Sequence, residues 1–340
     1  MKSVIILCLF LTRLCFQSYS QQVQLLTQNK NTSFRGLSVV DDQTIWVSGS
    51  QGMVGKSLDG GSVWQWIKVK NYENRDFRDI EAFDGQRAIV MAVDAPAVIL
   101  KTMDGGRSWR LVFSDSTRGM FLDAMDFADE NHGLVIGDPI NNKVFMASTD
   151  NGGENWKKLS NGSPALAEGE AFFAASGSNV KYQKNQKGNY EALYVSGGKK
   201  SRLWTYGSRQ WNDSLPIQQG AESTGANSLA TVDLLNGIVV GGDFSKAKNA
   251  SDNCVLFSLS SEYQFRKPNE GPHGYRSCVI YLTKDILLCC GLNGADLSSD
   301  GGMNWKLISP DSFNTCQKAK NGNAVFLAGS QGKIFKLIGL

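Results

Sequence analysis

The chain has 340 residues, and its 35 Lys or Arg against 32 Asp or Glu leave a formal net charge of only +3. Such a small charge, without a basic run, argues against a nucleic-acid partner. Residues 1–20 are predicted to be a secretory signal peptide, because Lys2 precedes an apolar stretch and Ser18-Tyr-Ser20 offers small residues for cleavage. No later window is long and apolar enough to cross a bilayer. We therefore expect an exported protein, secreted or periplasmic, whose mature part at residues 21–340 is a single domain.

Seven apolar runs follow one another along the mature chain and predict strands that are buried on both faces. They are rich in large apolar residues and end in small ones, and they lie at 45–50, 88–93, 133–138, 192–197, 237–242, 286–291 and 324–329. A period of about 40 to 50 residues with about four strands per unit is typical of a β-propeller. The sequence therefore predicts an all-β fold, a seven-bladed propeller.

A second family of segments precedes several of these runs and predicts the innermost strands, which would line a central channel. These segments lie at 34–39, 77–83, 121–127, 225–229 and 275–279. Residues 311–340 supply only three strands for the seventh blade. The N-terminal segment 23–27 is predicted to add the fourth strand, because this closes the ring and removes an open sheet edge.

Four short segments share the pattern S/T-x-D/N-G-G-x-x-W and predict tight hairpin turns. They lie at 57–64, 102–109, 149–156 and 298–305. In each, Gly can adopt positive φ, the acidic or amide side chain can accept backbone hydrogen bonds, and the Trp can pack back over the turn. We expect a structural role for these residues, which are Asp59, Asp104, Asn151 and Asp300 with Trp64, Trp109, Trp156 and Trp305.

These repeated turns resemble the Asp-box, or BNR, hairpin of several propeller families. The chain resembles more closely the propellers related to photosystem II stability and assembly factors, including exported bacterial members loosely labelled "oxidoreductase" or "glycosyl hydrolase". The resemblance is carried by the four turns and by segments at 34–39, 76–83, 123–127, 131–133, 169–172, 174–177, 241–243 and 274–277. It implies the propeller fold, Asp-boxes on the outer rim away from any site, and binding scaffolds for membrane-protein assembly rather than a defined reaction.

Charged residues in the inner-strand segments are the candidates for a site. Aligned on the second strands, Arg35, Arg78 and Arg276 occupy equivalent positions in blades one, two and six, and Asp79 and Asp123 follow one step later. One hypothesis is a structural charge network between blades. Another is a recognition site at the channel mouth, where the three guanidiniums grip a carboxylate or the polar face of a partner. Asp126 is a further candidate for that site.

A third hypothesis is glycan hydrolysis. Sialidase-like propellers combine three arginines with a Tyr nucleophile assisted by Glu and an Asp acid/base. Here Tyr275, Glu170 and Asp79 are the candidates for those catalytic roles. The hypotheses differ in whether two or three carboxylates and the arginines converge on an open pocket. We expect no enzyme activity, and a glycoside hydrolase rather than an oxidoreductase as the alternative.

Five cysteines remain after the signal peptide: Cys254, Cys278, Cys289, Cys290 and Cys316. Burial as small hydrophobes is the favoured interpretation, although an exported protein could form a bridge, and the odd number then leaves a thiol. Only two His are available and no cofactor motif is present, so no metal and no cofactor are expected. The predicted function is a non-enzymatic exported propeller, a monomer, that binds a protein or glycan partner.

Overall fold

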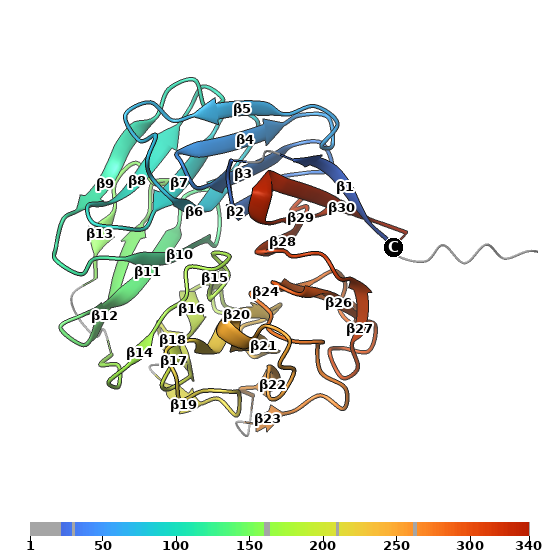
Figure 1. Cartoon of the computed structure of the whole chain (residues 1–340). Helices are drawn as coiled ribbons and strands as arrows, with labels where there is room; N and C mark the ends of the chain where they lie inside the picture. The colour runs from blue at the N-terminus through green and yellow to red at the C-terminus, as the bar shows by residue number, and fades with distance from the viewer. Residues whose placement is uncertain (1–21, 29–30, 160–163, 209–210, 261–263, 340) are drawn as a thin grey trace, which may run out of the picture.

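The structure, a computed structural model, describes residues 22–28, 31–159, 164–208, 211–260 and 264–339. The predicted signal peptide at 1–20 lies outside the described residues. Seven antiparallel blades surround a central channel, as predicted, and the only helical elements in the described part are the short 3-10 helices η1 (Phe244–Lys246) and η2 (Ser330–Gly332) (Figure 1).

In blades one to six the four main strands run outward from the channel in chain order. Blade one holds β2 (Phe34–Val39), β3 (Ile45–Gly49), β4 (Met53–Ser57) and β5 (Gln65–Lys68). Blade two holds β6 (Phe77–Ala82), β7 (Ala88–Ala92), β8 (Ala97–Thr102) and β9 (Arg110–Asp115). Blade three holds β10 (Leu122–Phe127), β11 (Gly133–Ile140), β12 (Lys143–Thr149) and β13 (Lys157–Lys158). Blade four holds β15 (Val180–Lys184), β16 (Tyr190–Val195), β18 (Arg202–Tyr206) and β19 (Asn212–Ser214).

The later blades follow the same plan with one extension. Blade five holds β20 (Thr224–Thr231), β21 (Asn236–Asp243), β22 (Cys254–Ser258) and β23 (Gln264–Arg266), and its sheet gains β14 (Glu170–Ala171) and β17 (Gly197–Gly198). Blade six holds β24 (Cys278–Tyr281), β25 (Leu287–Gly291), β26 (Gly294–Ser298) and β27 (Lys306–Ser309). Blade seven holds β28 (Thr315–Lys318), β29 (Val325–Ala328), β30 (Lys333–Ile338) and β1 (Gln22–Gln28).

The N-terminal strand closes the ring. β1 pairs antiparallel with β30, from Gln22 opposite Ile338 to Gln28 opposite Lys333, and the two run side by side in Figure 1. The predicted closure is confirmed, one residue longer at each end than the segment 23–27. The seventh blade therefore has the same four strands as the others.

The four repeated turns join the third and fourth strands of blades one, two, three and six. In blade two, Thr102 Oγ1 accepts from Gly106 N at 2.9 Å and Asp104 Oδ1 accepts from Ser108 N at 2.9 Å. Gly105 N also donates to Gln86 O, in the turn between the first and second strands. The repeated turns thus lie at the face where the innermost strands end.

Four of the innermost strands contain a β-bulge. The register skips Arg35 in β2, Arg78 in β6, Asp123 in β10 and Asn227 in β20, so each of these residues has no direct partner on the second strand. The extra residue of a bulge is turned out of the regular alternation. The bulges therefore collect one side chain per blade at the same end of the channel.

Candidate functional site

A cavity of about 440 Å³ occupies the mouth of the channel where the innermost strands begin. The bulge residues Arg35, Arg78 and Asn227 line it. Ser277 and Asn314 also line it. Ser277 N donates to Cys290 O, and the next residue, Cys278, is paired with the same Cys290. Asn314 and Thr315 share Ala328 in the same way, so both positions have the two-to-one pairing of a bulge. The backbone register of the blades therefore builds this polar ring.

Arg35 is a cation with no carboxylate partner among the described residues. Its guanidinium makes one long hydrogen bond within the described residues, from Nη1 to Ala175 O at 3.5 Å. Burial lowers the pKa of Arg35, the neighbouring charge of Arg78 lowers it further, and Asp76 opposes both effects. An anion at this position would supply the counter-charge that the protein does not.

Arg78 is better satisfied but points into the same cavity. Its Nε donates to Asp76 Oδ2 at 2.8 Å, and its Nη1 makes a 3.5 Å contact with Ala174 O. Its guanidinium lies 5.7 Å from the centre of the Phe121 ring. The one carboxylate that lines the cavity, Asp138, accepts from Phe172 N at 3.0 Å, and burial raises the pKa of Asp138. The mouth is therefore predominantly cationic.

Aromatic side chains form the opposite wall. Phe244 lies edge-on to Phe173 at 5.9 Å and to Tyr275 at 6.3 Å between ring centres, and it remains 42% exposed. Helix η1 places Phe244 there, and Asp243 Oδ1 caps that helix by accepting from Ser245 N at 2.9 Å. Apolar walls beside fixed charges are typical of sites that bind organic ligands.

The segment 172–178 forms a plug across the channel. Ser176 Oγ donates to Ser277 O of blade six at 2.7 Å, and the hydroxyls of Ser178 and Ser228 of blade five lie 2.7 Å apart. On the other side, a Cβ on Gly177 would lie 2.4 Å from the carboxylate atoms of Asp79 in blade two. The plug touches blades on opposite sides of the ring and is the floor of the arginine-lined cavity.

A second cavity of about 400 Å³ lies at the opposite mouth, beyond the plug. Asp79, Glu81, Asp126 and Lys181 line it, with Lys320 from blade seven. Its charges are largely paired: Lys320 Nζ bonds Glu81, and Lys181 Nζ lies 3.5 Å from Asp126. The predicted site residues Asp79 and Asp126 are therefore on the far side of the plug from Arg35 and Arg78.

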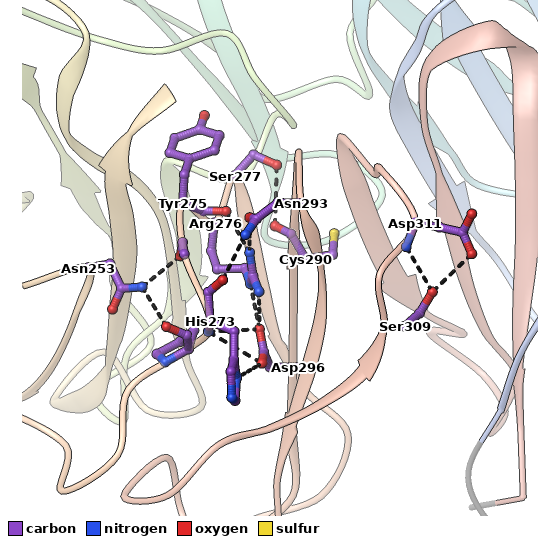
Figure 2. Close-up of polar contacts among 12 residues, drawn as sticks. Asn253, His273, Tyr275, Arg276, Ser277, Cys290, Asn293, Asp296, Ser309 and Asp311 are labelled. Atoms are coloured by element: carbon purple, nitrogen blue, oxygen red, sulfur yellow. Dashed lines mark hydrogen bonds and ion pairs between the residues drawn. The ribbon is translucent and has the colours of Figure 1, made fainter. Parts of the chain in front are cut away.

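Arg276 departs most from the sequence analysis. It is fully buried, bonds Asp296 through Nε and Nη2, and donates from Nη1 to Asn293 Oδ1 at 2.7 Å. Figure 2 shows its guanidinium directed to Asp296, which also accepts from His273 Nδ1 at 2.6 Å. The alignment with Arg35 and Arg78 is wrong by one residue, because Ser277 holds the bulge position. Arg276 belongs to a structural ion pair.

Asp123 also departs from its predicted place. It aligns with Arg78 rather than with Asp79, and it is fully buried, with no hydrogen-bond partner for either carboxyl oxygen among the described residues. Burial raises the pKa of Asp123 well above its usual value, the charge of Asp138 raises it further, and Arg78 opposes them. Asp123 lies beneath the cavity and does not line it.

The candidate catalytic residues do not converge. Asp79 is buried and accepts from Ile80 N and Met125 N, both at 2.8 Å. Glu170 is held by Arg202 and accepts from Ala167 N at 2.9 Å. Tyr275 does line the arginine cavity, but its hydroxyl donates to Asn227 Oδ1 at 2.8 Å.

Sequence reasoning missed the plug and the aromatic wall. The run Ala174-Ala-Ser-Gly-Ser178 is made only of small residues, which is the signal that a segment fits a narrow channel. Phe173 and Phe244 lie outside the segments predicted to be strands, and no periodic pattern points to them. Within the described ranges, no group of three or more His, Cys, Asp or Glu could hold a metal ion.

Comparison with known proteins assigns the chain to a family. The family model for photosynthesis system II assembly factor YCF48 matches residues 16–338. The chain belongs to this family. No curated protein matches it in sequence, and across the described part no helix is long and apolar enough to cross a membrane.

Solved structures agree on the fold. "YCF48 bound to D1 peptide" superposes with a TM-score of 0.62 at 16% identity, covering 94% of this chain and 97% of that chain. YCF48 from Cyanidioschyzon merolae gives 0.62 at 18% identity, covering 93% and 98%. The WD40 propeller domain of Doa1 gives 0.64 at 15% identity, covering 93% and 97%. At these low sequence identities, the structural similarity establishes the fold alone.

Proposed function

We propose that this member of the YCF48 family is a non-catalytic scaffold that binds a segment of a partner protein in the arginine-lined cavity. Arg35 carries the proposal, because it is a half-buried guanidinium without a carboxylate partner among the described residues. A peptide carboxylate between Arg35 and Arg78 would form the charge-assisted bonds that the long contacts to the plug do not provide. Apolar side chains of the same peptide would pack on Phe173 and Phe244.

The family supports a protein partner over a glycan. The neighbouring YCF48 structure contains a D1 peptide, and a propeller of the same fold with an open, charged mouth suits that kind of ligand. Hydrolysis is disfavoured because glycosidases need two carboxyl groups facing one site, whereas Asp79 lies beyond the plug and Glu170 is bonded to Arg202. Export through residues 1–20 and a monomeric state are further parts of the proposal.

The test uses labelled peptides on the mature chain. A set of fluorescent peptides that end in apolar residues is prepared with free C-terminal carboxylates and, as matched probes, with C-terminal amides. Binding is followed by anisotropy in the wild type and in Arg35→Ala, Arg78→Ala and Arg110→Ala. Arg110 is the control, because it is exposed on the outer strand β9 and bonds Glu154.

We expect Arg35→Ala to weaken the best peptide about tenfold or more, since a hydrogen bond to a charged group contributes about 1.5–3 kcal/mol. Arg110→Ala should bind as the wild type does. Amidation should reduce wild-type affinity and have little further effect in Arg35→Ala. Equal peptide binding by all variants would overturn the assignment of the site. Stabilisation of the protein by oligosaccharides, with no peptide having this effect, would overturn the proposal of a protein partner.

A further inference from the structure

Strand β25 separates the five cysteines of the mature chain into two groups. Cys289 packs with Cys254 in the apolar cluster that joins blades five and six. Cys290 packs with Cys278 and Cys316 in the cluster that joins blades six and seven. Neighbouring residues of a strand point to opposite faces of the sheet, so the adjacent pair Cys289 and Cys290 cannot meet. Three thiols share one interface, and we call them the thiol trio.

Cys278 is the central member of the trio. It lies directly opposite Cys290 across the β24–β25 ladder, and such pairs have Cα atoms about 4.5–5.5 Å apart, within the range of about 4.4–6.8 Å that a disulfide needs. Its Sγ also donates to Cys316 O at 3.3 Å. The position of Cys278 therefore suits either neighbour, and the cross-strand geometry favours Cys290.

Polar groups surround the sulfur of Cys278. The hydroxyls of Ser178 and Thr315 donate to its Sγ at 3.6 and 3.9 Å. Contacts with the thiols of Cys290 and Cys316 lower the pKa of the Cys278 thiol, against the opposing effect of burial. Burial raises the pKa of Cys290 and of Cys316. The thiolate is the form that attacks a disulfide, and Cys278, which lies opposite Cys290 and bonds Cys316 O, is the sulfur from which either neighbour can be reached.

We propose that the thiol trio is an oxidation site that takes up one disulfide, between Cys278 and Cys290, and keeps Cys316 as the remaining thiol. The oxidant is a disulfide donor, R–S–S–R, such as oxidised glutathione. The Cys278 thiolate attacks one donor sulfur and releases R–S⁻, and Cys290 then displaces the second R–S⁻ from the mixed disulfide. The protein loses two electrons and two protons, and the donor becomes two R–SH.

The site lies directly under the arginine-lined cavity. Ser178, which contacts Cys278, is the last residue of the plug, and Ser277, the residue before Cys278, lines the cavity. All three cysteines are fully buried, so the bond forms in the folding or locally opened chain and persists once packed. Oxidation would tie β24 to β25 one residue after Ser277, which lines the cavity.

The experiment counts and maps thiols in the mature chain. Protein refolded from denaturant in the presence of oxidised glutathione is denatured in acid, alkylated, weighed intact and digested without reductant. We expect three alkylated cysteines, one Cys278–Cys290 linked peptide, and five alkylated cysteines after dithiothreitol. Five free thiols in the oxidised sample would overturn the proposal, and so would a bridge that contains Cys254 or Cys289.

Variants then test the order of the thiols. Cys278→Ser should abolish the bridge, Cys290→Ser should move it to Cys278–Cys316, and Cys254→Ser should leave it unchanged as the matched control. A bridge between Cys290 and Cys316 in Cys278→Ser, formed as fast as in the wild type, would contradict the central role of Cys278. If Cys278→Ser does not fold, the peptide map of the wild type decides the proposal by itself.

Discussion

Replacing Gly177 with alanine should destabilise the protein strongly, because this glycine lets the plug cross the channel. Its φ of +68° lies in the left-handed region, which costs a residue with a Cβ about 1–2 kcal/mol. The new Cβ would also lie 2.4 Å from Cγ, Oδ1 and Oδ2 of Asp79, and overpacking a closely packed site costs about 1–3 kcal/mol. The sum predicts a loss of about 2–5 kcal/mol in the free energy of unfolding.

Gly188 offers a matched control. Its φ is +82°, but a Cβ there would meet nothing within 4 Å, so Gly188→Ala should lose only the backbone contribution of about 1–2 kcal/mol. Urea unfolding of both variants and the wild type, compared at equal m-values, gives the two losses. Equal losses in the two variants would refute the packing of the plug against Asp79, and with it the separation of the two cavities.

Three further tests probe the buried polar groups. Arg276→Met should cost about 3–5 kcal/mol because it leaves the Asp296 carboxylate buried without its guanidinium, and adding Asp296→Leu should recover part of that loss in thermal unfolding. Asp123→Asn should flatten the dependence of stability on pH. The raised pKa of Asp123 means that the folded wild type holds a proton that the unfolded chain releases above about pH 4, so wild-type stability falls as the pH rises from there. Urea midpoints measured at pH 4.5, 6 and 8 that decline equally in the wild type and the variant would contradict this. Trp305 Nε1 donates to Gly302 O at 2.9 Å, whereas Trp156 Nε1 is buried without a partner in the described residues. Trp305→Phe should therefore lower the free energy of unfolding by about 1 kcal/mol more than Trp156→Phe does. Equal unfolding midpoints of the two variants would argue against this difference.

The fold was predictable because its signals are local and repeated. Each buried second strand is an apolar run in the sequence, and each repeated turn contains the glycines and the hydroxyl acceptor that a tight hairpin needs. Closure of the ring by β1 followed from counting, since residues 311–340 supply three strands where the other blades have four. None of these inferences requires knowledge of contacts between distant residues.

The site was less predictable because it depends on register. A bulge shifts every later residue by one place, so the sequence alignment put Arg276 beside Arg35 when Ser277 holds that position. For the same reason, Asp123 in β10 occupies the bulge position that Arg78 holds in β6, and not the position of Asp79. A bulge leaves no composition signal, and an error of one residue in a strand exchanges a channel-facing side chain for one packed between blades.

The plug separates the charges of this channel into two groups, and this separation supports the proposed recognition function over hydrolysis. Hydrolysis of a glycoside requires an acid and a second carboxylate on either side of one bond, but segment 172–178 puts Arg35 and Arg78 above it and Asp79 and Asp126 below it. Arg78 keeps its ion pair with Asp76, but Arg35 is left with a carbonyl contact at 3.5 Å that neutralises no charge. Under the proposed function, a ligand that brings its own carboxylate would be stabilised at this mouth. Asp138, the one carboxylate that lines it, accepts from Phe172 of the plug, and Asp123 is buried beneath it.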